Sequence, residues 1–262
     1  MSIRPLDRDE LRHQFRTATP FPNVCIDNFL DENFAEEVAA SFPSFHEAQH
    51  VGKTFTAVNE KGKVQVRDVS HFPPAIRRLN DILADPQFLE LLSYAAEIPN
   101  LLADDQLIGG GIHETTRSGH LDVHVDFNFL NDRQWHRRLN IITFFNKGWR
   151  DEWGGRLELW DKDVKHCVHS FQPIFNRCVI FATSEISFHG VTAVMCPPGE
   201  SRKSFAAYYY TREAPPGYNG MNHSTLFRAR PNEQVKGKLL MPAERVANTF
   251  MNKVRRIKKK LM

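Results

Sequence analysis

The segment Gly119–Asn128, GHLDVHVDFN, places ionisable side chains at a spacing that could hold a metal ion. If this segment is a strand, alternate residues share one face of it. One face would then carry His120, Asp122, His124 and Asp126, and the other Leu121, Val123 and Val125. Ionisable groups on one face of an apolar β region are costly unless they serve a purpose. A solvent-exposed strand face explains the same pattern, so a His-x-Asp pair is weak support by itself.

The residues downstream strengthen the metal interpretation. His189 follows the apolar run CVIFATS, and the next predicted strand, RKSFAAYYYT, begins with Arg202 and Lys203. Two imidazoles and one carboxylate can occupy one face of an octahedral metal, which leaves three positions free. That arrangement suits non-haem Fe(II) that binds a chelating cosubstrate and O₂. A buried arginine supplies two parallel hydrogen bonds to a carboxylate of such a cosubstrate.

In this order the motifs resemble those of the Fe(II)/2-oxoglutarate-dependent dioxygenases, specifically the prolyl-hydroxylase-like branch. The resemblance covers about residues 108–211 and includes HVDFN, RLNIITFFNKGW, WGGRLELWD, PIFNRCVIFATS, SFHGV and RKSFAAYYYT. An N-terminal segment, PFPNVCIDNFLDENFAEEVAASFP, is also similar to the family. The resemblance implies a double-stranded β-helix, or jelly-roll barrel, with helices packed outside. It also implies Fe(II) as cofactor, 2-oxoglutarate as cosubstrate and ascorbate as a supporting reductant.

Carried over residue by residue, the resemblance makes His124, Asp126 and His189 the iron ligands and Arg202 the 2-oxoglutarate anchor. The side chains expected to assist in cosubstrate binding are Ser204, Asn140 and Tyr208. The sequence His120-Leu121-Asp122 offers a competing His-x-Asp register. We prefer the second pair because the family places its pair directly before a polar loop, which here begins at Phe127-Asn128.

Two positions depart from the pattern of the family. Phe144 stands near a position where many relatives have a tyrosine that binds 2-oxoglutarate, and His113 or a neighbour replaces a second tyrosine. Another donor, such as Asn140, Thr143 or Ser204, must then assist Arg202, unless the alignment slips by one residue. Lys203 competes with Arg202 for the anchor role, because some relatives use a lysine. We favour arginine because its planar fork matches a carboxylate.

The elements that must position these residues can be outlined from the sequence. Helices are predicted after Asp31, from Pro73-Pro74 and from Asp85-Pro86, with a hairpin around Glu60-Lys61-Gly62. After Pro99, short β-branched and aromatic runs alternate with turn residues, which indicates a sandwich or barrel. These runs are 121–127, 139–145, 156–160, 167–171, 178–182 and 204–211. We expect a mainly β fold with flanking helices: a helical support region at 1–99, the catalytic core at 100–213 and a basic helical tail at 214–262, together one cooperative domain.

Composition limits the class of protein. No apolar run among the 262 residues approaches the roughly 18 residues that span a bilayer, and the charged start MSIRPLDRDE is no signal peptide, so we expect a cytoplasmic protein. Four scattered cysteines argue against a disulfide framework. Residues 214–262 carry 11 Lys/Arg and two acids (11 − 2 = +9). This tail, with a helix predicted from Pro242, is expected to pack on the body or to contact an anionic partner.

The expected activity is hydroxylation of a C–H bond, with release of succinate and CO₂. The substrate is a small molecule, a glycan or a peptidyl residue, proline among the candidates. Two other classes stay open. A cupin-like enzyme would keep the metal without 2-oxoglutarate, and a non-catalytic jelly roll would bind a ligand without either.

Overall fold

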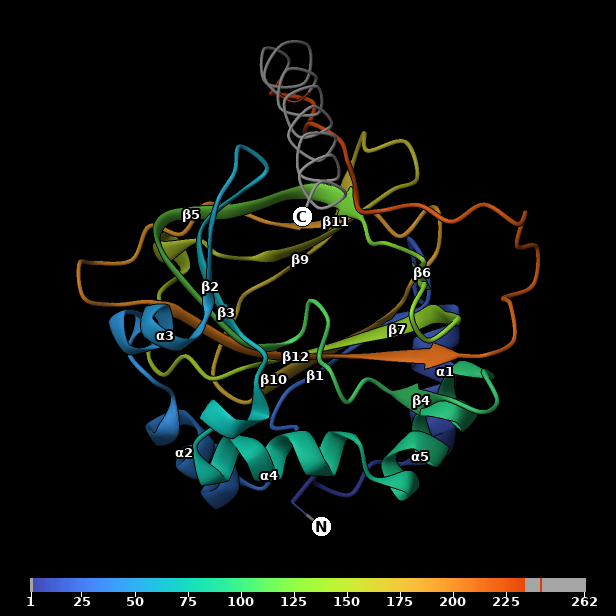
Figure 1. Cartoon of the computed structure of the whole chain (residues 1–262), viewed down its shortest axis with the longest axis horizontal. Coiled ribbons are helices and arrows are strands. Elements are labelled where there is room, and N and C mark those ends of the chain that lie inside the picture. Colours follow the sequence, from blue (N-terminus) through green and yellow to red (C-terminus); the bar gives the residue numbers. More distant parts are fainter. Residues whose placement is uncertain (1, 234–240, 242–262) are drawn as a thin grey trace, which may run out of the picture.

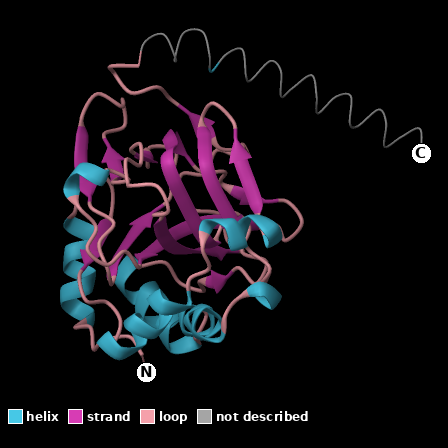
Figure 2. Ribbon diagram, turned by 90° about the vertical axis from the view of Figure 1, so that its left-hand side faces the viewer, coloured by secondary structure: helices cyan, strands magenta, loops and turns pink. Residues whose placement is uncertain are grey.

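The computed structural model describes residues 2–233 and 241 (Figure 1). The helix predicted from Pro242 lies outside the described residues. Within them, antiparallel strands build one continuous sheet that curls into two layers, and the helices gather at one side of it (Figure 2). The strands are β1 (Asn23–Ile26), β2 (Lys53–Thr56), β3 (Glu60–Val66), β4 (Leu102–Ala103), β5 (Gly111–Val125), β6 (Phe129–Leu130), β7 (Trp135–Phe144), β8 (Leu157–Trp160), β9 (Cys167–Phe171), β10 (Arg177–Ala182), β11 (His189–Val191), β12 (Arg202–Thr211) and β13 (Leu226–Phe227).

The strand order is that of a jelly roll. The main path runs β1-β10-β7-β12-β5-β11-β8-β9, so neighbours in space are mostly distant in the chain. Strand β5 belongs to both layers: its first residues pair with β12, its last residues pair with β11, and β3 pairs with it from Ile112 to Leu121. The predicted mainly β fold with a jelly-roll core is confirmed, and the sheet closes around a central space into which alternate residues point.

The helices are α1 (Arg8–Thr17), α2 (Glu32–Ser41), α3 (Phe45–Val51), α4 (Pro74–Leu83) and α5 (Pro86–Ala96), with short 3₁₀ turns at Val69–His71 and Asp151–Trp153. Helix α2 begins as predicted, because the Asp31 side chain accepts hydrogen bonds from the backbone N–H groups of Asn33 and Phe34. None of the described helices is long and apolar enough to cross a membrane.

Helices α1 and α3 were not predicted from the sequence. Helix α1 follows an Asp7 cap and buries only Leu11 and Phe15, too short a stripe to stand out from its charged neighbours. The helices cover the outer face of the β10-β7-β12 layer, where Ile141, Phe205 and their neighbours form the main core. Packing this face against the helices fixes the opposite face of the same strands toward the central space.

The chain on either side of the core also joins the sheet. In the N-terminal region, β1 pairs with β10 and β3 pairs with β5, so this region supplies strands as well as helical support. After β12 the chain returns, and β13 pairs with the end of β5 at Val125 and His124. The described part of the segment expected to be a helical tail therefore holds a strand, and Thr225 and Phe227 of this segment line the central space.

Candidate metal and cosubstrate site

His124, Asp126 and His189 converge on one point inside the barrel. His124 lies near the end of β5, Asp126 follows that strand directly, and His189 begins β11, which is paired with β5 so that His189 lies opposite His124. Nε2 of His124 is 3.5 Å from Oδ1 of Asp126, and Nε2 of His189 is 3.4 Å from Oδ2. One ligand atom from each residue lies within 4.8 Å of the others. The structure thus brings together the preferred His-x-Asp pair and the distant histidine.

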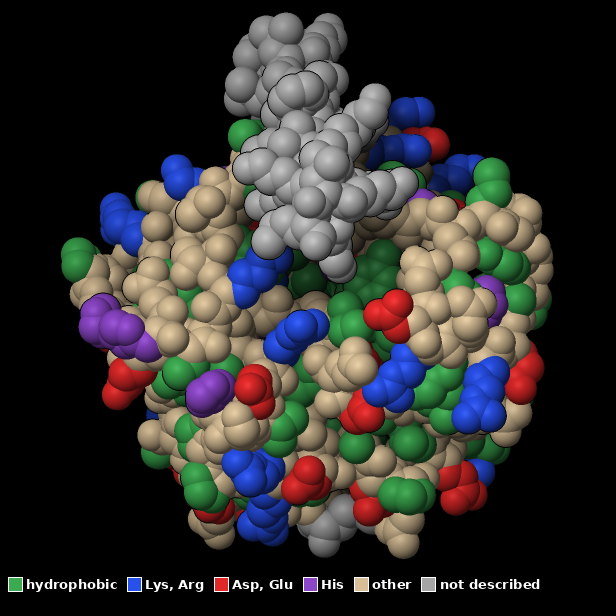
Figure 3. All heavy atoms as spheres, viewed as in Figure 1, with side chains coloured by type: hydrophobic (Ala, Val, Ile, Leu, Met, Phe, Trp, Pro, Cys, Tyr) green, Lys and Arg blue, Asp and Glu red, His purple; other side chains and the backbone are tan. Residues whose placement is uncertain are grey.

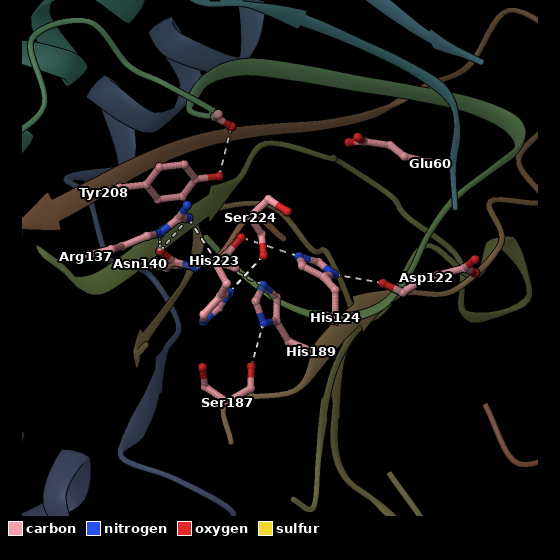
Figure 4. Close-up of polar contacts among 12 residues, drawn as sticks. Glu60, Asp122, His124, Arg137, Asn140, Ser187, His189, Tyr208, His223 and Ser224 are labelled. Carbon is pink, nitrogen blue, oxygen red and sulfur yellow. Dashed lines mark hydrogen bonds and ion pairs between the residues drawn. The ribbon is translucent and has the colours of Figure 1, made fainter. Parts of the chain in front are cut away.

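Backbone carbonyls orient both imidazoles (Figure 4). Nδ1 of His124 is 2.8 Å from the carbonyl oxygen of Asp122, and Nδ1 of His189 is 2.9 Å from that of Ser187. A carbonyl only accepts, so each Nδ1 carries a hydrogen, and in the neutral imidazole each Nε2 then keeps its lone pair. Both lone pairs are therefore available on the side of Asp126, which is the arrangement a metal-binding histidine needs.

Asp126 is held ionised by its neighbours. Its Oδ2 accepts a hydrogen bond of 2.8 Å from Nδ2 of Asn140 and lies 3.1 Å from Nη2 of Arg137. Burial alone would raise the pKa of Asp126, but Arg137, His189 and His124 together hold it well below its usual range. Asn140 in turn accepts two hydrogen bonds from Arg137 through its Oδ1. The carboxylate is therefore charged and fixed in direction.

The histidines are buried among apolar side chains. Burial, and then the adjacent His124, lower the pKa of His189 to about 3, so this imidazole is neutral at neutral pH. The ring centroid of Phe181 lies 4.7 Å from that of His189, and Phe227 of β13 lies 5.4 Å from His124. Neutral imidazoles and an ionised carboxylate are the protonation states that bind a divalent metal.

These donors fit a non-haem iron site. Two imidazole nitrogens and one carboxylate oxygen face one space, the Asp126 carboxylate is ionised and the His189 imidazole is neutral, and each donor is held by a second group. Such a facial set of two histidines and one carboxylate, open on its other side, is diagnostic of non-haem Fe(II) oxygenases. The donor set therefore fits the metal that the sequence predicts.

A buried cation lines the same cavity, which has a volume of about 650 Å³. The Arg202 side chain donates from Nε to the carbonyl oxygen of Gly155 at 2.7 Å and from Nη1 to Oγ of Ser204 at 3.2 Å. Within residues 2–233, no carboxylate lies within ion-pair distance of it. Burial lowers the pKa of Arg202 to about 10, which leaves it charged at neutral pH. A buried guanidinium without an acidic partner fits an anionic ligand such as 2-oxoglutarate.

The surroundings of Arg202 explain how the cavity accommodates Phe144. The Arg202 guanidinium carbon lies 4.9 Å from the centroid of the Phe144 ring, a cation–π contact in place of a tyrosine hydroxyl. His113 lies opposite Ser204 in the β5–β12 pairing and also lines the cavity. The Lys203 side chain instead lines a separate small pocket beside Trp149, on the other face of β12. The alternation predicted for this strand thus separates Arg202 from Lys203.

Two of the predicted assisting residues lie elsewhere in the cavity. Asn140 contacts Asp126 and Arg137, and no hydrogen bond joins it to Arg202 in the described structure. The hydroxyl of Tyr208 donates to the carbonyl oxygen of Gly109 at 2.9 Å, and its ring lies 3.6 Å from the guanidinium carbon of Arg137. Ser204 is the one of the three predicted assistants with a hydrogen bond to Arg202.

The prediction that Asp122 shares a face with His124 is wrong. Leu121 lies opposite Val191 and His124 opposite His189, so β5 carries one extra residue between these two pairs. This bulge reverses the alternation, because each inserted residue moves the following side chains to the other face. Leu121 consequently lines the cavity, while the carboxylate of Asp122 turns away toward Arg230 (Figure 4).

Arg137 and Phe227 line the cavity but were not predicted from the sequence. A second irregularity, at Tyr209 and Tyr210 of β12 against Leu139 and Arg137 of β7, brings Arg137 onto the face of Asn140. No signal within β7 marks this change, because it depends on the pairing with β12. Leu226-Phe227 is a run of only two apolar residues some distance after a proline-rich turn, which is a weak pattern for a strand. The return of this segment to the site could therefore not be predicted from the sequence either.

Known proteins share sequence features with the part of the chain that holds this site. Residues 110–210 match the sequence model of the 2OG-Fe(II) oxygenase superfamily. The chain is 34% identical over 88 residues to the mouse (Mus musculus) protein prolyl 3-hydroxylase OGFOD1, which covers 31% of this chain and 16% of that protein. The chain thus aligns with only a small part of the length of this relative.

Solved structures share the fold. A prolyl hydroxylase from Trichoplax adhaerens, in complex with a peptide of a hypoxia inducible factor, superposes with a TM-score of 0.56 at 17% identity, over 78% of this chain and 90% of that one. A prolyl-4-hydroxylase from Pseudomonas putida gives a TM-score of 0.54 at 16% identity, over 77% of this chain and 99% of the other. At these identities the likeness establishes the fold.

Proposed function

Because residues 110–210 match the sequence model of the 2OG-Fe(II) oxygenase superfamily, we propose that this protein is an Fe(II)- and 2-oxoglutarate-dependent dioxygenase that hydroxylates a C–H bond of its substrate. The observation that carries the proposal is the presence of two sites in one cavity. One is the cluster of His124, Asp126 and His189, and the other is the buried Arg202, a cation with no carboxylate partner in the described structure. A cupin-like enzyme that lacks 2-oxoglutarate would have no use for the second.

The protein side of the reaction follows from this arrangement. When bound, iron supplies the activation of O₂ that couples decarboxylation of 2-oxoglutarate, to succinate and CO₂, with hydroxylation of the substrate. His124, Asp126 and His189 would hold the metal. Arg137 and Asn140 keep the Asp126 carboxylate ionised and aimed at it. Arg202, with Ser204, would bind the far carboxylate of 2-oxoglutarate.

Peptidyl proline is the substrate class we put forward first. The mouse relative carries the name prolyl 3-hydroxylase, and both structural relatives above are prolyl hydroxylases. The cavity has a volume of about 650 Å³, and Phe227 and Leu157 give it apolar walls that suit a proline ring.

Anaerobic reconstitution tests the proposal before any substrate is known. Addition of Fe(II) and then 2-oxoglutarate should produce a weak visible metal-to-ligand absorption band, and admission of O₂ should slowly form succinate. Alanine variants of His124, Asp126 and His189 should each lose bound iron and the band. His120→Ala serves as the control and should retain both.

Each rival predicts a different result. Metal binding without the band or succinate would favour the cupin-like enzyme, and absence of metal binding would favour a non-catalytic jelly roll. Loss of iron in His120→Ala but not in His124→Ala would move the metal site to the competing register.

A further inference from the structure

The hairpin of β2 and β3 extends the inner wall of the cavity outward. Pairing places Lys53 opposite Gln65, Gln65 opposite His113, and His113 opposite Ser204, in one row that runs across four strands. Phe55, Lys63 and Arg67 also line the cavity, as alternation along the two strands requires. In Figure 1 these strands lie beside β5. The hairpin therefore presents one face to whatever occupies the outer part of the cavity.

This face is basic. The Lys63 ammonium lies 2.6 Å from the Glu60 carboxylate, and both side chains are largely buried. Lys53 and Arg67 are exposed, and neither forms an ion pair within residues 2–233. The ammonium groups of Lys53 and Lys63 lie 4.3 and 4.8 Å from the centroid of the Phe55 ring, which holds both over one aromatic surface.

The cavity keeps a positive charge when it is loaded. Its lining includes five Lys or Arg side chains and two acidic ones, Glu60 and Asp126, so the balance is 5 − 2 = +3. Fe(II) adds two positive charges and the 2-oxoglutarate dianion removes two, so the balance is unchanged. Figure 3 shows the side of the molecule on which a hollow lies near the centre, with Lys and Arg side chains along one margin of that hollow. A cavity lined by one sign of charge concentrates ligands of the other sign.

The pKa of His113, inside the cavity, is affected by the same positive charges. Burial, followed by the charges of Lys63 and Arg202, lowers the pKa of His113 well below its usual range. The field thus extends from the hairpin to the strand that carries Arg202. Arg202 is committed to the cosubstrate and Arg137 to Asp126, which leaves Lys53 and Arg67 at the outer end for the substrate.

We propose that the substrate carries acidic groups next to the hydroxylated residue, and that Lys53 and Arg67 bind them. For a peptidyl substrate this means Asp or Glu side chains flanking the target proline. The inference rests on the proposed function, because it assumes that the substrate enters a cavity already occupied by Fe(II) and 2-oxoglutarate. A basic or neutral peptide would meet the same wall without any compensating carboxylate.

Peptide binding tests the proposal. Three fluorescent peptides of equal length, each with a central proline flanked by acidic, neutral or basic residues, are titrated anaerobically with protein loaded with Fe(II) and 2-oxoglutarate. We expect the acidic peptide to bind at least about tenfold more tightly than the neutral one, and the basic one most weakly. The preference should shrink as salt is raised, because exposed charges are screened.

Charge-reversal variants assign the preference to the wall. The double variant Lys53→Glu/Arg67→Glu should invert the order of the three peptides, and Lys53→Gln/Arg67→Gln should abolish the difference. Lys162→Glu/Lys165→Glu makes the same change in net charge on exposed residues outside the cavity and should keep the order. Thermal unfolding checks that all variants are folded.

Equal binding of the three peptides, including no binding of any of them, would overturn the proposal, as would an unchanged order in the charge-reversal variant. The visible band of the Fe(II)–2-oxoglutarate complex distinguishes failure of this inference from failure of the proposed function. A protein that shows the band but no charge preference keeps the proposed function and loses this inference, whereas absence of the band refutes the function itself.

Discussion

Arg202 illustrates how a single residue depends on its neighbours. Its guanidinium passes so close to Gly155 that a Cβ on that residue would lie 2.9 Å from Cδ of Arg202, and Gly155 also has a φ of +65°. Glycine is therefore required there both for conformation and for space. The carbonyl of the same glycine accepts a hydrogen bond from Nε of Arg202. The turn thus shapes the cosubstrate pocket through its backbone.

Replacement of Arg202 should separate cosubstrate binding from metal binding. Removing one partner of a buried charged pair costs roughly 2–5 kcal/mol, which is about a 30- to 4,000-fold loss of affinity. Arg202→Ala should therefore raise the apparent dissociation constant for 2-oxoglutarate by that factor while iron still binds. Lys203→Ala, on the other face of β12, should change it little. If the two variants behave the other way round, Lys203 is the anchor.

Glu114 is a buried acid outside the site, and it should make stability depend on pH. Burial raises the pKa of Glu114 from 4.5 to about 7, although the hydrogen bond from Ser201 opposes the shift. Between these two values the folded protein holds a proton that the unfolded chain has released, so stability falls as pH rises. The loss is on the order of 3 kcal/mol by pH 8.

Glu114→Gln should remove this dependence. Chemical denaturation at pH 5 and pH 8 should show the variant gaining stability relative to the wild type at the higher pH, because a neutral amide has no proton to lose. The exposed Glu90→Gln is the control and should track the wild type. A wild-type stability that stays level or rises across this interval would contradict the assignment.

Among the secondary-structure elements, strands β5, β8 and β11 are linked by one residue from much later in the chain, Arg230, which contacts all three. Arg230 donates from Nε to Oε2 of Glu158 at 2.9 Å and lies 3.6 Å from the buried Asp122 carboxylate. Its Nη2 also donates to the carbonyl oxygen of Val191 at 3.3 Å. The backbone that supports His124 and His189 is therefore braced by the segment after β13.

Arg230→Met should be strongly destabilising, because it removes the guanidinium between two buried carboxylates. Loss of one partner from a buried charged cluster typically costs about 3–5 kcal/mol. Denaturant titration should show this loss, and Arg230→Met/Glu158→Gln should recover part of it. The exposed Arg212→Met should be neutral. If the Arg230→Met protein is as stable as the wild type, the contacts of Arg230 do not contribute to the stability of the fold.

At the scale of the whole molecule, the site joins both layers of the barrel. The metal-binding candidates come from β5 and β11, and Arg202 comes from β12 in the helix-covered layer. A ligand that contacts all three strands binds the folded state only, so it must stabilise the fold as a whole.

Thermal unfolding with ligands measures this coupling. At a hundredfold excess over the dissociation constant, Fe(II) and 2-oxoglutarate together should add about 2.7 kcal/mol or more. For a chain of this size that is a rise in melting temperature of roughly 5–10 °C. Chelation of the metal should reverse the rise, and His189→Ala should abolish it. An equal rise in that variant would place the ligands elsewhere.

The kind of chemistry and the fold class follow from local patterns in the amino-acid sequence. The order of a His-x-Asp pair, a distant histidine and a basic residue at a strand start needs no tertiary information, and the longer strands of the core are marked by their own residues. Alternation within β12 separated Arg202 from Lys203 correctly, because that separation depends only on the local geometry of a strand.

Where strands are irregular, the pairing of distant strands sets which side chains share the cavity. The bulge in β5 turns Asp122 away from His124, and the irregularity between β7 and β12 brings Arg137 to Asp126. The return of β13 and the placement of the basic β2–β3 wall are likewise decided by pairing with β5. The physical reason is the same in each case: the face on which a residue lies is set by hydrogen bonds to a partner strand remote in the chain, and a one-residue shift reverses it.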